Sequence, residues 1–274
     1  MIKQLLSLFF ILITITAFAQ KKEKVKGSRI LSTETTPVYG FQRLVLNEDF
    51  EVKLVKADST SVQIMTDDNL HEYITIVSQD STLSLKTTAR LQEKKLEITI
   101  FYNDLLNTIE LNEDAEISSE NTLKFNDLTL TASESSKAFL TIECDLFKII
   151  NNNRAKVELN LTANAVNLEL NDNSRLIALI NASKIVADLL ESADAKIEGD
   201  TENLLLVADN SSDFRGEKLT AKDANVKTEN RARTSIDVSG NLLINASGTS
   251  EISIYGSPKI TLESFEDNAI LRRK

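Results

Sequence analysis

The sequence has one cysteine, Cys144, one histidine, His71, and no tryptophan. A single cysteine excludes an intramolecular disulfide and every Cys-x-x-Cys site, and a single histidine excludes metal sites that need two histidine ligands. The acidic neighbours Glu143 and Asp145 are expected to raise the pKa of Cys144, so we interpret this thiol as structural rather than reactive. His71 follows the segment "DDNL" and is expected in a surface turn without a catalytic role.

Glycine and proline are also scarce, with seven and two residues among 274. The closest glycines are eight residues apart, so the G-x-G-x-x-G and P-loop motifs of nucleotide-binding proteins and the G-x-S-x-G motif of hydrolases are absent. Aromatic residues make up 5% of the chain and apolar residues 42%. The core is therefore expected to consist mainly of Leu, Ile and Val.

Positive charge is in deficit, with 31 basic against 41 acidic residues. Nucleic acids and anionic lipids are bound through clustered positive charge. Neither is expected as a partner of this chain.

Residues 1–19 have the features of a signal peptide. Lys3 supplies the positive start, residues 5–18 form an apolar stretch, and Ala17-Phe18-Ala19 fits the small-x-small cleavage rule. The stretch is shorter than the roughly 20 residues of a membrane-spanning helix. We expect cleavage after Ala19, export to the periplasm, the outer surface or the medium, and no integral membrane segment.

Four acidic pairs offer carboxylates in principle: Glu48-Asp49, Asp67-Asp68, Glu113-Asp114 and Glu266-Asp267. Neighbouring residues of a strand point to opposite sides, so an adjacent pair is poor evidence of a shared catalytic cleft. We interpret all four pairs as solvated turns. No catalytic, cofactor-binding or metal-binding residue is predicted, no cofactor is expected, and the binding residues stay unassigned.

The second half of the chain repeats one pattern: an alternating apolar run, a polar break and a second run. In "VNLELNDNSRLIAL", residues 166–179, we expect Val166, Leu168 and Leu170 inside, residues 171–174 at a corner, and Leu176 on the next face. Alternation with period two predicts strands, and the break predicts a turn. The residues expected to point inward after each break are Leu140, Val157, Leu176, Ile197, Phe214, Ile236 and Ile252.

These inward positions follow one another at intervals of 17, 19, 21, 17, 22 and 16, a mean of about 18.7. Strand repeats of this length predict a β-solenoid, with unequal steps placed in outer loops. A β-sandwich is the alternative, although its hairpins favour Asn-Gly turns, which the sequence lacks. Stacked asparagines are expected at the corners: Asn152, Asn171, Asn210 and Asn230. Outward positions on the faces are Arg154, Lys156, Glu158, Asn160, Arg231, Arg233, Ser235 and Asp237.

The mature chain shows no convincing helical period, so the whole of it is predicted to be all-β, a right-handed β-solenoid with irregular N-terminal strands leading into it. We expect a flexible linker over residues 20–40 and a β region over 41–125 that is continuous with the solenoid. Repeats with a period of about 19 follow over 126–265, and 266–274 form a tail or cap.

The segments "FQRLVLNEDFEVKLVKADSTSVQIMTDDNLHEYITI" and "LEITIFYNDLLNTIELNEDAEI", the broken repeats and the closing "YGSPKIT" follow in this order. Together they resemble the "putative auto-transporter adhesin, head GIN domain" family over roughly residues 40 to 265. The resemblance implies a secreted or envelope-associated bacterial protein with a β-helical fold and no established activity. It supplies no functional residues to carry over.

The leading hypothesis is an exported, non-enzymatic adhesion-type module that binds a cell-surface glycan or an envelope protein. A β-helical polysaccharide-active enzyme and a purely structural envelope protein are the alternatives. An exposed aromatic strip would support binding, and its candidates are Tyr39, Tyr73, Tyr102 and Tyr255. The open ends of a solenoid also predict end-to-end self-association.

Overall fold

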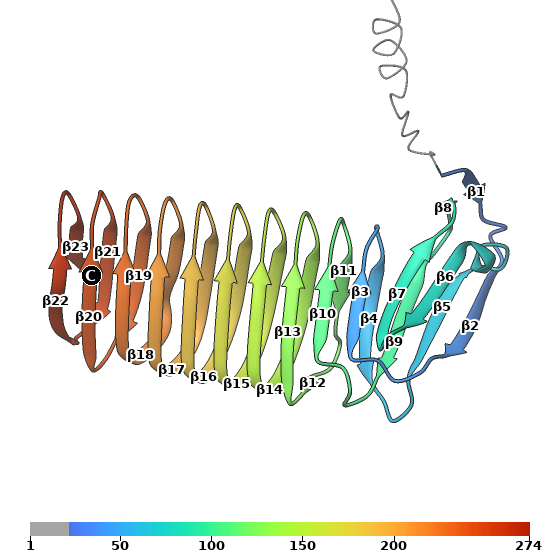
Figure 1. The fold of residues 1–274 in the computed structure, drawn as a ribbon, viewed down its shortest axis with the longest axis horizontal. Coiled ribbons are helices and arrows are strands. Elements are labelled where there is room, and N and C mark those ends of the chain that lie inside the picture. The colour runs from blue at the N-terminus through green and yellow to red at the C-terminus, as the bar shows by residue number, and fades with distance from the viewer. Residues whose placement is uncertain (1–21) are drawn as a thin grey trace, which may run out of the picture.

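The structure is a computed structural model that describes residues 22–274 (Figure 1). The signal peptide expected over residues 1–19 lies outside this range. The predicted all-β solenoid is confirmed, and it has about nine turns. Each coil rises along a front sheet, turns at the top and descends along a back sheet while the stack advances towards the C-terminus, which is a right-handed winding (Figure 1).

Five long strands each run from the back sheet, around the bottom of the coil, into the front sheet: β14 (Lys137–Asn151), β15 (Lys156–Leu170), β16 (Arg175–Leu189), β17 (Asp194–Ala208) and β18 (Asp213–Thr228). The front sheet also contains β3 (Arg43–Leu46), β10 (Thr108–Leu111), β13 (Asp127–Ala132), β20 (Asn241–Ala246) and β22 (Lys259–Phe265). The back sheet also contains β4 (Glu51–Lys56), β11 (Glu116–Ser118), β12 (Leu123–Lys124), β19 (Arg233–Val238), β21 (Glu251–Gly256) and β23 (Ile270–Arg273). These coil strands pair in parallel, and their inward side chains form one apolar core.

Neighbouring coils are held in a nearly constant register. One inward column has a constant sequence separation of 19 and contains Ala138, Val157, Leu176, Ala195 and Phe214. Thr234 and Ile252 continue it at separations of 20 and 18.

The seven residues predicted to point inward are all buried. Three of them, Leu140, Ile197 and Ile236, lie two residues beyond the column that the other four share. The prediction of outer loops from unequal steps is therefore wrong. The error arose because the shared column is occupied in these three coils by small residues, Ala138, Ala195 and Thr234. A search for large aliphatic residues selects the next inward position, two residues further on, instead.

The extra residue of the longer step, between Phe214 and Thr234, lies inside a strand. β18 has 16 residues, against 15 in β14 to β17, and its pairing with β17 shifts between Lys196 and Glu198. Gly216 lies at this bulge, and a Cβ atom there would lie 2.5 Å from the ring of Phe214. The bulge therefore absorbs one residue without opening the stack.

The N-terminal end is closed by strands that extend both sheets, mainly in antiparallel fashion: β2 (Leu31–Pro37), β5 (Ser61–Asp67), β6 (Ile74–Gln79), β7 (Thr82–Thr87) and β9 (Glu97–Tyr102). β5 pairs with β2 and β9, and β6 pairs with β7. The 3-10 helix η1 (His71–Tyr73) follows β5. β1 (Lys24–Lys26) and β8 (Arg90–Gln92) form a separate two-stranded sheet.

The flexible linker expected over residues 20–40 is wrong for much of its length, because β1 and β2 lie within it. β2 forms a seven-residue antiparallel ladder with β5. The side chains of β2 are mostly exposed, so this part of residues 20–40 shows no apolar alternation that would predict a strand. Its threonines nevertheless favour strand structure. At the other end, residues 266–274 contain the last top turn and β23, so they continue the stack as a final half-coil.

Candidate functional site

The top turns carry a column of residues with left-handed backbone. The members have φ between 56° and 73°: Glu48, Glu113, Glu134, Asn153, Asp172, Glu191, Asn210, Asn230, Gly248 and Asp267. Their side chains link coils: the Glu134 N–H donates to Asn153 Oδ1 (3.0 Å), and the Asn153 N–H donates to Asp172 Oδ2 (2.9 Å). These oxygens satisfy backbone donors that point along the stack, so the column has a structural role.

The predicted asparagine ladder is confirmed for one pair. Asn171 Nδ2 donates to Asn152 Oδ1 over 2.9 Å. Asn210 and Asn230 belong to the neighbouring left-handed column, and Asn230 Nδ2 donates to Asp209 Oδ1 instead. The four asparagines thus occupy two columns rather than one.

Two of the acidic pairs meet at the junction between the N-terminal strands and the solenoid. The Glu48 N–H donates to Glu113 Oε2 over 3.1 Å, although 65 residues separate them. Both pairs line a hollow of about 500 Å³: Glu48, Asp49, Glu113 and Asp114, with Lys22, Arg90 and Glu93 beside them. Sequence reasoning missed this meeting because strand spacing says nothing about neighbouring coils.

The electrostatics of Glu48 do not suit a general acid. Burial acts to raise its pKa, but hydrogen bonds from Lys22 and from the hydroxyl and N–H of Thr87 outweigh burial, so the pKa lies below its ordinary value. A glycosidase general acid needs a raised pKa. Glu48 therefore binds structural donors and stays ionised.

The remaining two acidic pairs differ from each other. Glu266 and Asp267 lie in an exposed top turn, as predicted. Asp67 contradicts the prediction of a solvated turn, because it is the last residue of β5 and is fully buried. Its Oδ2 accepts the Lys94 N–H over 2.7 Å.

Three of the remaining side chains singled out in the sequence are covered. His71 lies in η1 with its side chain mostly covered, and its Nε2 is 2.9 Å from the Ser32 hydroxyl on β2. Cys144 is buried. Its pKa is raised to about 12, mainly by burial and to a smaller extent by the negative charges of Asp127 and Asp145. Tyr102 is also buried, and its ring stacks on Phe125 with centroids 5.0 Å apart.

The four tyrosines do not form an aromatic strip. Tyr39 is 87% exposed, Tyr73 and Tyr255 are half-buried, and Tyr102 belongs to the core. An aromatic binding surface built from these four residues is not present.

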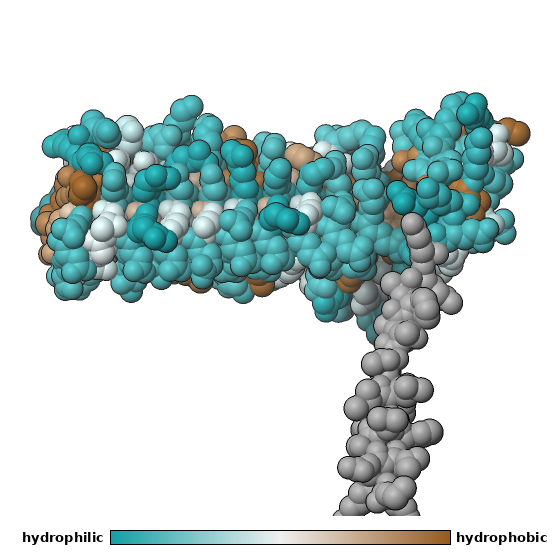
Figure 2. Space-filling model, turned by 90° about the horizontal axis from the view of Figure 1, so that it is seen from above, coloured by the Kyte–Doolittle hydropathy of each residue, from teal (hydrophilic) through white to brown (hydrophobic). Residues whose placement is uncertain are grey.

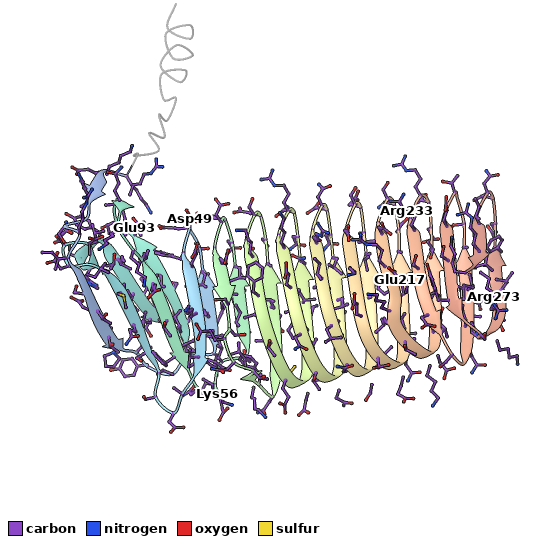
Figure 3. All side chains as sticks on the ribbon, turned by 180° about the vertical axis from the view of Figure 1, so that it is seen from behind. Asp49, Lys56, Glu93, Glu217, Arg233 and Arg273 are labelled. Atoms are coloured by element: carbon purple, nitrogen blue, oxygen red, sulfur yellow. The ribbon has the colours of Figure 1, made fainter. Side chains whose placement is uncertain are left out.

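All eight residues predicted to point outward are exposed or half-buried, but only six of them lie on the flat faces, because Arg154 and Arg231 lie in top turns before β15 and β19. Charged side chains are distributed along the whole stack, as Asp49, Glu217, Arg233 and Arg273 show (Figure 3). Over residues 22–274, no group of three or more His, Cys, Asp and Glu is placed to hold a metal ion.

One region of the front face is apolar and hollow. Ala165 lies between Leu146 and Lys184 in adjacent coils, and its small side chain leaves a depression of about 390 Å³. Leu146 is 51% exposed at its edge, and Val186 lines the depression. The surrounding polar side chains are Asp127, Lys148, Asn167 and Lys184. An apolar floor with a polar rim suits binding rather than chemistry.

No helix within residues 22–274 has the length and apolarity required to cross a membrane.

A family profile described as "Putative auto-transporter adhesin, head GIN domain" matches residues 40–178 and again residues 153–258. Overlapping matches are expected where similar coils align at more than one offset. The resemblance drawn from the sequence is thereby confirmed. No protein of curated function matches the chain.

Solved structures of low sequence identity share the fold. A "putative adhesin" from Parabacteroides distasonis has a TM-score of 0.60 at 18% identity, over 91% of this chain and 100% of that chain. A "putative adhesin" from Parabacteroides merdae has 0.57 at 18%, over 92% and 99%. A "Putative lipid binding protein" from Parabacteroides distasonis has 0.59 at 14%, over 92% and 100%.

Proposed function

Because this chain belongs to the family described as "Putative auto-transporter adhesin, head GIN domain", we propose that it is an exported, non-enzymatic adhesion-type module of the bacterial cell envelope. The observation that carries the proposal is the apolar depression beside Leu146 on the otherwise polar front face. A rigid stack of coils presents such a face without rearrangement, which lowers the entropic cost of binding.

The chemistry of the depression favours a protein partner over a glycan. Its apolar side chains are mainly aliphatic, with Leu146 and Val186 at the surface and Leu205 39% exposed in the next coil. An aliphatic surface fits apolar side chains of a protein, and Lys184 with Asp127 on the rim offers both signs of charge. A glycan is the alternative that the experiment separates.

The test measures retention of the protein that starts at Gln20 on an immobilised envelope fraction, before and after protease treatment of the fraction. We expect the protein to be retained, and we expect Leu146→Asp to abolish retention because a carboxylate would lie in the apolar depression. Leu179→Asp is the matched control, since Leu179 is 43% exposed on the opposite face. Protease treatment is expected to remove the binding.

Each other outcome counts against a part of the proposal. Absence of retention would overturn the adhesion function and favour the structural alternative. Retention that survives protease but not removal of polysaccharide would assign a glycan partner. Release of sugar fragments by the protein would favour the enzyme alternative.

A further inference from the structure

The C-terminal end of the solenoid leaves an edge of each sheet unpaired. β22 pairs with β20 and β23 pairs with β21, and no strand of residues 22–274 pairs with the outer edge of either. A strand edge with free N–H and C=O groups is a template for pairing with another chain.

The same end exposes the apolar interior. Leu242 and Ile244 of β20 are 1% and 0% exposed, whereas Ile260 and Leu262, their register partners in β22, are 40% and 50% exposed. Phe265 is a further 39% exposed side chain of this end. Apolar residues gather at the C-terminal end of the stack, at the left of Figure 2. Side chains that every earlier coil covers remain in contact with water here, so covering them favours association.

The N-terminal end is a poor partner for this surface. Its outermost back strand, β2, is mostly exposed and polar, carries Glu34 and ends at Pro37, which has no N–H to donate. The interior beneath it is covered, since Phe41 and Leu70 are 1% and 0% exposed. Head-to-tail stacking would therefore place β23, the last back strand, against a polar strand that ends in proline.

The charges at the C-terminal end separate by sign between the two sheets. β22 begins with Lys259, but its second half and the following turn carry the acids Glu263, Glu266 and Asp267, while β23 and the residue after it carry the bases Arg272, Arg273 and Lys274. Charges on an edge strand commonly prevent pairing. Opposite signs on the two edges instead make the end complementary to a second copy of itself.

The orientation follows from these charges. A two-fold axis parallel to the strands places β22 of one copy antiparallel to β23 of the other. Glu263 lies two residues before the end of β22 and Arg272 two residues after the start of β23, so this pairing brings them close together. The other two-fold arrangement pairs β23 with β23 and opposes the arginines, which is unfavourable.

We propose that the partner of this end is a second copy of the chain, joined C-terminal end to C-terminal end, with β22 of each copy paired to β23 of the other. The contact is isologous and closed, so it yields a dimer rather than a fibre. This inference goes beyond the proposed adhesion function. The two-fold axis would place the front-face depressions of the two copies on opposite sides of the particle, so a dimer could link two partners.

Sedimentation velocity over a wide range of protein concentration tests the association without any ligand. We expect the protein from Gln20 to Lys274 to pass from monomer to dimer, and Leu262→Lys to remain monomeric. Leu146→Lys is the matched control, because Leu146 has the same exposure, 51% against 50%, far from the end. A wild-type monomer at all concentrations, or a Leu262→Lys dimer, would overturn the proposal.

Disulfide cross-linking tests the strand pairing. Cys144 is buried, so introduced cysteines are the accessible thiols. The double variant Glu263→Cys, Arg272→Cys is expected to give covalent dimers under a mild oxidant, whereas each single variant is not. Covalent dimers of Glu263→Cys alone would show β22 paired with β22 and would overturn this arrangement.

Discussion

Asn171 Nδ2 donates a hydrogen bond of 2.9 Å to Oδ1 of Asn152, the residue that occupies the same place in the preceding coil. The two residues are 19 positions apart in the sequence and adjacent in the stack. A polar break that looks like a solvated loop in one coil is therefore part of an ordered column across several coils.

Replacement of Asn171 by alanine is expected to remove this bond and lower the free energy of unfolding by about 1 kcal/mol. Urea unfolding of both proteins measures the difference. Asn173→Ala is the control, because the Asn173 side chain is exposed in the same turn. Equal losses for the two variants would mean that the ladder bond has no special role.

Replacement of Ala195 by leucine is expected to destabilise the protein by roughly 1–3 kcal/mol, because Leu176 and Phe214 already fill the column on both sides. Thermal unfolding followed by circular dichroism measures the effect. Asn160→Leu, at an outward position of β15, is expected to change stability by less than about 0.5 kcal/mol. A neutral Ala195→Leu variant would contradict the register described above.

Cys144 is expected to be unreactive in the folded protein. Burial and two nearby acids raise its pKa to about 12, so the thiolate is almost absent near neutral pH, and the thiolate is the nucleophile. Reaction with a coloured disulfide reagent at about pH 8, below the pKa of a free thiol, should be slow without denaturant and fast in urea. Fast labelling of the native protein would contradict this expectation and show that the bottom of the coil, where β14 passes from the back sheet to the front sheet, opens.

Glu48 is expected to make stability fall in acid. Its pKa is lowered in the folded state, so its contribution is present above the unfolded pKa of about 4.3 and is lost as the pH falls through the folded value. Thr87→Val removes one donor, so the variant should lose less stability than the wild type on acidification. Urea unfolding across this pH window measures both, with Thr82→Val as the control on β7. Identical pH profiles of Thr87→Val and the wild type would contradict this account of Glu48.

Much of the fold could be predicted because most strands of the solenoid alternate between buried and outward side chains. Val166, Leu168 and Leu170 are buried as predicted, since period-two alternation specifies two faces and only one of them is apolar. The prediction was wrong where polarity was taken for flexibility, as in β2, and where an acid was assumed to be solvated, as at Asp67. The pairing of β2 with β5 and the contact of Asp67 with the Lys94 N–H both join segments that are far apart in the sequence, so the local sequence does not reveal them.

The candidate surfaces were less accessible to prediction. Leu146 is one apolar residue among many in the sequence, and it becomes the edge of a depression because Ala165 lies beside it in the next coil. Glu48 and Glu113 likewise meet through the stacking of two coils that 65 residues separate.

The sequence by itself determined that this chain is an all-β solenoid with aliphatic columns inside and Asn-, Asp- and Glu-rich turns, because alternation and turn chemistry act within a few residues. Only the tertiary structure decided the nearly constant register between coils, the depression beside Leu146 and the apolar end at Leu262. All three features depend on which side chains become neighbours in adjacent coils. Those neighbours are far apart in the sequence, so packing between coils determines them.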